Sequence, residues 1–456
     1  MKFYPHQSQA LEETKDFNKV AYYLDMGLGK TYVGAEKMFR LNSSVNLLVC
    51  QKSKIVDWIE HMVLNYAMTH CWTIYNLTNK DEFQMFINAI EKVDEMRNAG
   101  LVANIVGVIN YELAWRRPIL KVLKDFTLIL DESSQIQNEE AKQSKFILTL
   151  NPANVILLSG TPTSGKYENL WSQAHLLGWK ISKKLYNKQY VNWKKIDIGG
   201  FPQWIVDKDE PYKNIERLKA KLRQYGAVFM KTEEVFDLPE KNFIKVMVNA
   251  SKEYKKFMKN SIISIDTLNL SGFKDDSDFH GKDMTPRVEL VGDTTLTKRL
   301  YARQLCGQYN KDKLHSFKDL ASSTHDRLII FYNFNAELDA LKNIAVNLNK
   351  PISEVNGHTK NLSNYESEDN SITFIQYQAG AMGLNLQKAN KIVYFTPTVR
   401  CEQWMQSLKR IHRIGQNKPC FYYQIICKGS IEEDMYKALE RGVDYTDELF
   451  REYDLR

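Results

Sequence analysis

The sequence has few cysteines and no long apolar run. Its six cysteines are scattered, with no C-x-x-C pair and no Cys/His cluster at zinc-binding spacing, which argues against a disulfide-stapled fold and against a zinc module. No apolar run is long enough to span a membrane, and the first residues lack the apolar core of a signal peptide. We therefore expect a cytoplasmic protein whose thiols are reduced and mostly buried.

The composition is otherwise ordinary for a globular protein, with 43% hydrophobic and 26% charged residues. A chain of 456 residues is long enough for two or three domains, each with its own core. The net charge of +7 is mild over this length. It permits a polyanionic partner without requiring one.

A glycine-containing stretch, residues 23–31, lies between an apolar run and a helical pattern, which predicts strand, turn and helix. Gly27 and Gly29 let backbone N–H groups close around a phosphate, Lys30 supplies a positive charge, and Thr31 supplies a hydroxyl for a magnesium ion. One glycine of the usual eight-residue pattern is missing. In isolation, a turn that only caps a helix is therefore the alternative.

Gln7 precedes this loop by about twenty residues. Its amide can read the donor and acceptor edge of adenine. A surface glutamine beside the preceding proline is equally consistent with the sequence.

Apolar runs that alternate with helical patterns and end in polar residues predict a doubly wound α/β lobe with a parallel sheet. The predicted strands are residues 45–50, 105–109, 126–130 and 155–158. Ligands bind at the carboxyl ends of such strands. Lys52, Lys54 and Asn110 could therefore contact a nucleic-acid backbone, although exposed lysines are more often only solvated.

The third of these strands delivers two adjacent carboxylates, Asp131 and Glu132. In a nucleotide enzyme the first can hold a magnesium ion through water, and the second can orient or deprotonate the attacking water. The pair follows the phosphate loop by about a hundred residues, a normal separation for two halves of an ATP site.

Residues 178–224 have a basic, aromatic and helical pattern. The basic and aromatic residues include Lys183, Lys184, Tyr186, Lys188, Tyr190, Trp193, Lys194 and Lys195. Such interleaving can bind nucleic acid, but a helical insertion that packs its aromatic rings inside is the favoured interpretation. Residues 229–241 look like a connector, and residues 271–292 predict a mobile loop.

A second α/β unit begins near Lys241, with strands predicted at residues 243–248, 327–332, 372–376 and 391–395. A helix is then expected to carry Arg410 and Arg413. Their spacing of three places both on one helix face. Two arginines aimed together form either a phosphate clamp or half of an ion-pair network.

Taken together, these residues resemble the Swi/Snf-type ATPases of helicase superfamily two, over nearly the whole chain and in motif order. The matching stretches are D-M-G-L-G-K-T at 25–31, L-D-E-S-S-Q-I-Q-N at 130–138, L-S-G-T-P at 158–162 and, most specific, Q-S-L-K-R-I-H-R-I-G-Q at 406–416. The family usually has His or Gln where this chain has Ser134. Because of this departure, the sequence leaves open how the motif that contains Asp131 and Glu132 is linked to Thr161.

The resemblance implies two tandem RecA-like lobes, residues 1–235 with a helical insertion at 178–228 and residues 236–456 with a helical insertion and mobile loop at 251–315. It implies ATP and Mg²⁺ as cofactors, with Lys30, Asp131, Glu132, Arg410 and Arg413 as catalytic residues and Thr31 and Asp131 at the metal. The implied cofactor-binding residues are Gln7, Met26, Gly27, Leu28, Gly29, Lys30, Thr31 and Gly383. The expected nucleic-acid contacts are Lys52, Ser53, Asn110, Tyr111, Asn333, Gln378 and Asn385.

By the same resemblance the chain is expected to hydrolyse ATP between its lobes and to translocate on double-stranded DNA without reading sequence. Accessory modules are absent, as in compact bacterial or phage members of the family. Three alternatives stay open: a conventional helicase acting on single strands or RNA, a non-catalytic DNA-binding scaffold, and a protein-docking role for the basic insertion.

Overall fold

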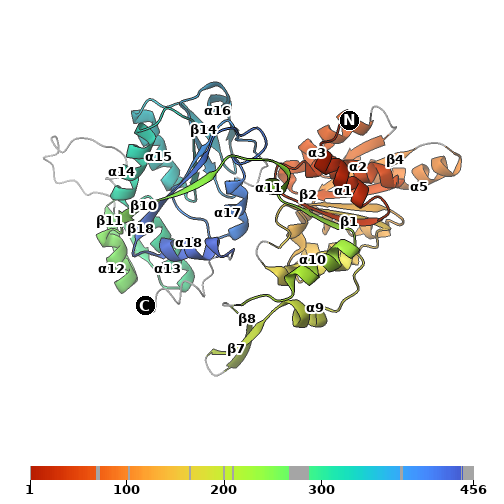
Figure 1. Ribbon diagram of the computed structural model, residues 1–456, viewed down its shortest axis with the longest axis horizontal. Helices are drawn as coiled ribbons and strands as arrows, with labels where there is room; N and C mark the ends of the chain where they lie inside the picture. Colours follow the sequence, from red (N-terminus) through yellow and green to blue (C-terminus); the bar gives the residue numbers. More distant parts are fainter. Residues whose placement is uncertain are drawn as a thin grey trace. The chain divides into compact units, whose positions relative to one another are not determined.

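The computed structural model describes residues 2–67, 72–100, 103–163, 166–198, 201–207, 210–266, 287–379, 384–442 and 444. The chain divides into two compact units, Met1–Phe236 and Asp237–Arg456, drawn in red to green and in green to blue in Figure 1. The expected boundary, between residues 235 and 236, lies one residue earlier. Within the described ranges, no helix combines the length and apolar character needed to cross a membrane.

The first unit contains a seven-stranded sheet in the order β3-β4-β2-β5-β6-β1-β9, and every neighbouring pair is parallel. Its strands are β1 (Lys19–Leu24), β2 (Val45–Cys50), β3 (Trp72–Asn76), β4 (Asn104–Asn110), β5 (Thr127–Asp131), β6 (Asn154–Leu158) and β9 (Ala227–Met230). The four predicted strands are confirmed as β2, β4, β5 and β6. The expected connector is wrong at its start, where β9 forms an edge of the sheet.

Helices cover both faces of this sheet (Figure 1). They are α1 (Pro5–Glu13), α2 (Lys30–Leu41), α3 (Ile55–Met62), α5 (Lys80–Asn98), α6 (Tyr111–Ala114), α7 (Lys142–Thr149), α8 (Trp171–Leu176) and α11 (Thr232–Val235), with short helical turns at η1 (Lys52–Lys54), η2 (Val63–Ala67), η3 (Pro118–Val122), η4 (Ser133–Ile136) and η5 (Tyr167–Leu170). In β2, Leu47 and Val49 join the core on one face, and Leu48 and Cys50 join the core on the other. Burial on both faces explains why the strand is apolar throughout.

The insertion in the first unit contains α9 (Lys183–Tyr190), the antiparallel hairpin of β7 (Trp193–Ile198) and β8 (Phe201–Val206), and α10 (Ile215–Gln224). The insertion expected to be helical thus contains a β-hairpin between its two helices. Two alternating runs separated by Gly199 and Gly200 are a hairpin signal, and it outweighs the helical pattern here. The expected burial of aromatic rings is confirmed for Tyr186 and Tyr190, whereas Trp193 on the hairpin is exposed.

The second unit contains another seven-stranded sheet, in the order β10-β18-β17-β13-β16-β14-β15, parallel except for the β14–β15 pair. Its strands are β10 (Lys241–Asn249), β13 (Leu328–Tyr332), β14 (Ile352–Val355), β15 (Lys360–Asn361), β16 (Ile372–Gln376), β17 (Lys391–Tyr394) and β18 (Cys420–Lys428), and its helices are α12 (Lys252–Asn260), α13 (Thr295–Cys306), α14 (Lys311–Ser322), α15 (Asn335–Asn347), α16 (Ser363–Ser367), α17 (Cys401–Leu408) and α18 (Ile431–Glu440). Two parallel α/β sheets flanked by helices confirm the predicted fold class.

A short antiparallel pair, β11 (Ile262–Asp266) and β12 (Arg287–Val291), precedes α13. Residues 271–286 of the predicted mobile loop lie outside the described residues. Residues 287–291 of that prediction form β12 instead, because they pair residue by residue with β11.

The core of the second unit contains a buried ion pair between α14 and α18. Lys313 Nζ lies 2.6 and 2.7 Å from the two carboxylate oxygens of Glu432, and both side chains are almost fully buried. Burial disfavours charge on Lys313, but the Glu432 carboxylate together with Cys427 and Cys306 more than offsets it, so the pKa of Lys313 is raised. Cys306 and Cys427 lie beside Glu432. Because the ammonium already occupies both carboxylate oxygens, this cluster is an ion pair rather than a metal site. The five cysteines in the described residues are buried, as expected.

Candidate active site

The predicted phosphate loop joins β1 to α2. Gly27 and Gly29 have φ angles of 90° and 75°, which residues with side chains rarely adopt, so the path of the loop requires both glycines. Lys30 begins α2, and its Nζ reaches back over the loop to the Leu24 carbonyl at 3.0 Å. Left-handed glycines, a helix N-terminus and a lysine together form an arrangement that suits a phosphate group. Thr31 is partly exposed in the first turn of α2.

Gln7 of α1 packs directly on this loop. Its Nε2 donates to the Leu28 carbonyl at 3.2 Å, and its Oε1 accepts from the Tyr4 N–H at 3.0 Å. A Cβ added at Gly29 would lie 2.1 Å from Gln7 Nε2, so the contact leaves no room for a side chain there. The alternative of a surface glutamine is wrong, since Gln7 is only 5% exposed. The adjacent His6, which the sequence analysis overlooked, contacts the same Leu28 carbonyl at 3.0 Å.

Asp131 is the last residue of β5, and in the sheet only β6 separates β5 from β1. Because these strands are parallel, Asp131 lies at the same edge as the phosphate loop. Its Oδ2 accepts a hydrogen bond from Trp58 Nε1 at 2.8 Å. Burial raises the pKa of Asp131, while the Trp58 hydrogen bond and the charges of Lys30 and Lys54 lower it. This carboxylate can therefore accept a cation at the edge where the lysine also acts.

Glu132 follows with φ of 53°, in the left-handed region. A residue with a side chain pays about 1–3 kcal/mol for such a conformation, and strain of this kind concentrates at functional sites. The end of β6 also approaches the loop, since a Cβ at Gly160 would lie 3.2 Å from Lys30 Nζ and 3.3 Å from Met26 Cγ. The carboxyl ends of β1, β5 and β6 thus bring the phosphate loop, the two carboxylates and Gly160 together.

A buried glutamine on α8 connects the segments that follow β5 and β6. Ser133 Oγ donates to Gln173 Oε1 at 2.8 Å, and Gln173 Nε2 donates to the Pro162 carbonyl at 2.9 Å. Gln173 is fully buried. It is a site residue that the sequence analysis missed, although a glutamine within the apolar pattern of residues 170–177 could have indicated it. These hydrogen bonds link Ser133, Gln173 and Pro162 and do not involve Ser134, the position at which this chain departs from the family pattern.

Two of the expected nucleic-acid contacts in this unit are buried. Tyr111 is 2% exposed, and its hydroxyl donates to the backbone carbonyl of Asp131 at 2.9 Å. Its burial contradicts the expected contact, because the ring supports the carboxylate strand from within. Asn110 is also buried and donates to Glu112 at 2.6 Å. Lys52 and Ser53, by contrast, are exposed in η1 after β2.

The helix expected to carry the two arginines is shorter than predicted. α17 ends at Leu408, so Arg410 and Arg413 lie in the turns that follow rather than on one helix face. In these turns the Arg410 carbonyl accepts a hydrogen bond from the Leu386 N–H at 3.2 Å. The Gln416 side chain donates to three further backbone carbonyls around the turn. Tertiary hydrogen bonds have replaced helical ones.

The environments of the two arginines differ. Arg410 is 1% exposed. Arg413 is partly exposed and donates to the Leu384 carbonyl at 3.4 Å. Burial lowers the pKa of the Arg413 guanidinium below its ordinary value, yet an arginine in a protein stays charged. Of the pair, Arg413 is the better placed to reach a ligand.

The other residues expected to form a site in the second unit fall into three groups. Asn333, at the end of β13, uses its amide within the unit, donating to Thr396 Oγ1 at 2.8 Å. Gln378 and Asn385 are exposed and can contact a partner. Gly383 lies outside the described residues.

Comparisons with known proteins follow the same motifs. The SNF2-related domain matches residues 23–309. A mouse protein, SWI/SNF-related matrix-associated actin-dependent regulator of chromatin subfamily A member 1, is 25% identical over 91% of this chain and 40% of its own length. The ISWI chromatin-remodeling complex ATPase ISW1 of Saccharomyces cerevisiae is 22% identical over 93% of this chain and 38% of its own length. The chain therefore spans about two fifths of these relatives.

Among solved structures, the Sulfolobus solfataricus SWI2/SNF2 ATPase core in complex with dsDNA covers 99% of this chain and 92% of its own, at 20% identity and a TM-score of 0.42. The SNF2-related match extends over more than half of the sequence and includes the phosphate loop and the carboxylate strand. This chain belongs to the SNF2-related domain family.

Proposed function

We propose that this chain is a Swi/Snf-type translocase that hydrolyses ATP and moves along double-stranded DNA. The observation that carries the proposal is the edge of the first sheet, where Lys30, Asp131 and Gly160 come together in a chain of the SNF2-related family. Its similarity to a regulator of chromatin and to a chromatin-remodeling ATPase supports ATP as its substrate and DNA as its partner.

In this proposal Lys30 binds the phosphates, Gln7 recognises adenine, and Glu132 orients the attacking water. Magnesium fits the donors present, because Thr31 offers a hydroxyl and Asp131 a carboxylate at one edge of the sheet. When bound, the ion would neutralise charge that develops on the phosphate oxygens. Met26, Gly27, Leu28 and Gly29 contribute the backbone of the loop.

The second unit contributes Arg410 and Arg413 as proposed arginine fingers, which in phosphoryl-transfer enzymes are worth about 10³–10⁵ in rate. Lys52, Ser53, Gln378 and Asn385 are the exposed candidates for contact with the DNA backbone. Contacts to phosphate and sugar fix position without reading sequence, in keeping with a translocase.

The decisive experiment measures ATP turnover without nucleic acid and with double-stranded DNA, single-stranded DNA or RNA, beside a Lys30→Ala control. We expect stimulation by duplex DNA and loss of turnover in the control, because Lys30 is the charge on the phosphates. Displacement of a triplex-forming strand from duplex DNA would then show movement along the duplex.

Two other outcomes would replace the proposal. Stimulation by single strands or RNA above that by duplex DNA, with efficient strand separation, would indicate a conventional helicase. Turnover equal to that of Lys30→Ala under all four conditions would indicate a DNA-binding scaffold without catalysis.

A further inference from the structure

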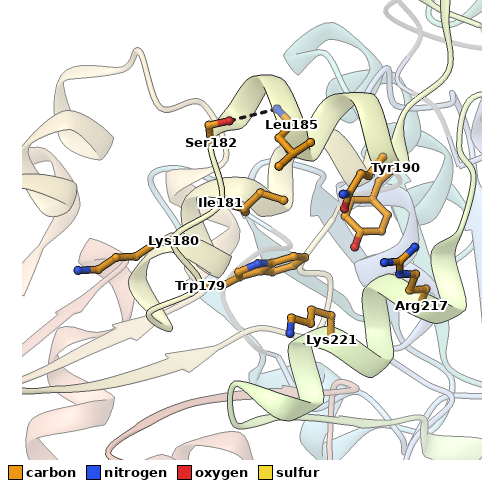
Figure 2. Close-up of a pocket in the computed structure, with 9 residues that line it drawn as sticks. Trp179, Lys180, Ile181, Ser182, Leu185, Tyr190, Arg217 and Lys221 are labelled. Carbon is orange, nitrogen blue, oxygen red and sulfur yellow. Dashed lines mark hydrogen bonds between the residues drawn. The ribbon is translucent and has the colours of Figure 1, made fainter.

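Residues in and next to the insertion of the first unit line a pocket of about 370 Å³, and none of them belongs to the phosphate loop (Figure 2). Trp179 lies at its centre, Ile181 and Leu185 lie on one side, and Arg217 and Lys221 of α10 lie on the other. None of these residues has a role in the proposed hydrolysis.

Contacts between aromatic rings hold the residues that line the pocket in place. The Trp179 ring stacks on Tyr225 with centroids 6.0 Å apart and meets the edge of Tyr186 at 6.1 Å. Trp171 Nε1 donates to the Ile181 carbonyl at 2.8 Å and fixes the segment that enters α9. The walls are therefore held in place before any ligand arrives.

The charge around the pocket is positive. Among the described residues, its lining includes Lys180, Arg217 and Lys221 and no Asp or Glu. Arg217 and Lys221 are four residues apart, so they share one face of α10. No hydrogen bond or ion pair joins Arg217 to another described residue. The neighbouring Glu216 forms an ion pair with Lys219 instead, with 2.7 Å between Oε1 and Nζ. An anionic group of a ligand would therefore complement the positive charge of the residues that line the pocket.

The apolar residues of the pocket favour one kind of anionic ligand, an acidic protein segment, over another, a nucleic acid. Trp179 is 8% exposed and Tyr190 2%, so little ring surface remains on which a nucleobase could stack. Leu185, in contrast, is 46% exposed. An aliphatic wall beside two cations suits an apolar side chain flanked by carboxylates better than it suits a nucleic acid.

We propose that this pocket docks an acidic segment of a partner protein, with an apolar side chain inserted beside Leu185 and carboxylates paired with Arg217 and Lys221. The volume suits one large side chain, and the cations at the rim select the residues around it. This inference does not rest on ATP hydrolysis, so it can be tested independently of the proposed function.

The test uses fluorescence anisotropy with a labelled synthetic peptide in which a Leu-Phe pair is flanked on both sides by Asp and Glu. The whole chain should bind this peptide, and replacing the Leu-Phe pair by Ser-Ser should weaken binding. The double variant Arg217→Glu/Lys221→Glu should bind at least about tenfold more weakly. Lys184→Glu/Lys188→Glu, which alters the charge of α9 equally outside the pocket, should change affinity less than about threefold.

Three results would overturn the proposal. The first is no binding of the peptide to the unaltered chain at low salt. The second is an equal loss in both double variants, which would indicate general electrostatic attraction. The third is displacement of the peptide by a single-stranded oligonucleotide whose own binding depends on Arg217 and Lys221, which would make the pocket a nucleic-acid site. Thermal unfolding midpoints of all variants confirm that they fold.

Discussion

The two units hold their proposed site residues in different ways. In the first unit, Lys30, Asp131 and Gly160 follow strands of one parallel sheet, so the sheet itself fixes their positions. In the second unit, Arg410 and Arg413 lie in turns after α17, held by the Leu386 N–H and the Gln416 side chain. A strand end is a rigid support, whereas such a turn depends on a small number of hydrogen bonds.

This difference suggests a division of labour that can be tested. The unit proposed to bind the nucleotide is expected to be less sensitive to single hydrogen bonds around its site. The unit that supplies the arginines is expected to be sensitive, because its turn can adopt another conformation at low cost.

The largest effect is expected for Arg413→Ala. If the turn supplies an arginine finger, DNA-stimulated ATP turnover falls by about 10³-fold or more. The unfolding midpoint stays unchanged, because the Arg413 side chain is partly exposed and its hydrogen bond to the Leu384 carbonyl is long at 3.4 Å. Lys418→Ala, an exposed cation near the same turn, serves as the control. A decrease of less than tenfold would show that the turn of the second unit does not supply an arginine finger.

Glu432→Gln is expected to destabilise the second unit by about 3–5 kcal/mol, because it leaves the Lys313 ammonium buried without its carboxylate. Urea unfolding measures the change in the free energy of unfolding. Lys437→Gln breaks an exposed ion pair on the same helix and is expected to cost about 0–1 kcal/mol. Equal effects of the two substitutions would argue against the importance of the buried pair.

A smaller effect is expected for Gln173→Leu in the first unit. The change leaves the Ser133 hydroxyl and the Pro162 carbonyl without their partner, which costs about 1–3 kcal/mol. We expect the kcat for ATP to fall about tenfold with little change in KM, because the strands still position Lys30 and Asp131. Ser134→Ala should leave both values nearly unchanged. The opposite ranking of the two variants would assign the connection to Ser134.

The smallest effect concerns pH. The Trp58 hydrogen bond stabilises the ionised form of Asp131, so Trp58→Phe raises the pKa of that carboxyl further. If the carboxylate must be ionised for turnover, the acid limb of the pH–rate profile moves to higher pH in this variant. Turnover well above the limb should stay close to that of the unaltered chain. If the acid limb of the profile does not move, a group other than Asp131 determines it.

Much of the first unit could be predicted from sequence, for a physical reason. Strands buried on both faces are continuous apolar runs, as at residues 45–50 and 155–158, and the residues that follow them are polar because ligands bind there. Short or mixed strands carry little of this signal. β9 has only four residues, and Tyr422, Tyr423 and Gln424 interrupt the apolar residues of β18, so neither was predicted.

The features that could not be predicted depend on contacts between distant segments. The turn at Arg410 requires Leu386, 24 positions earlier, and nothing in its own sequence ends the helix. Gln173 interrupts an apolar pattern, but its two partners, Ser133 and Pro162, cannot be identified from the local sequence. Local patterns predict elements, whereas the positions of site residues outside strand ends follow from tertiary hydrogen bonds.

The hydrogen bond from the Trp58 indole to Asp131 also provides an optical signal. An indole buried beside a carboxylate emits according to the charge near its ring nitrogen, so any event that changes the charge at Asp131 should alter the emission of Trp58. Subtracting the spectrum of Trp58→Phe from that of the unaltered chain isolates this residue from the other seven tryptophans. The first unit therefore contains its own fluorescent reporter of what binds at the end of β5.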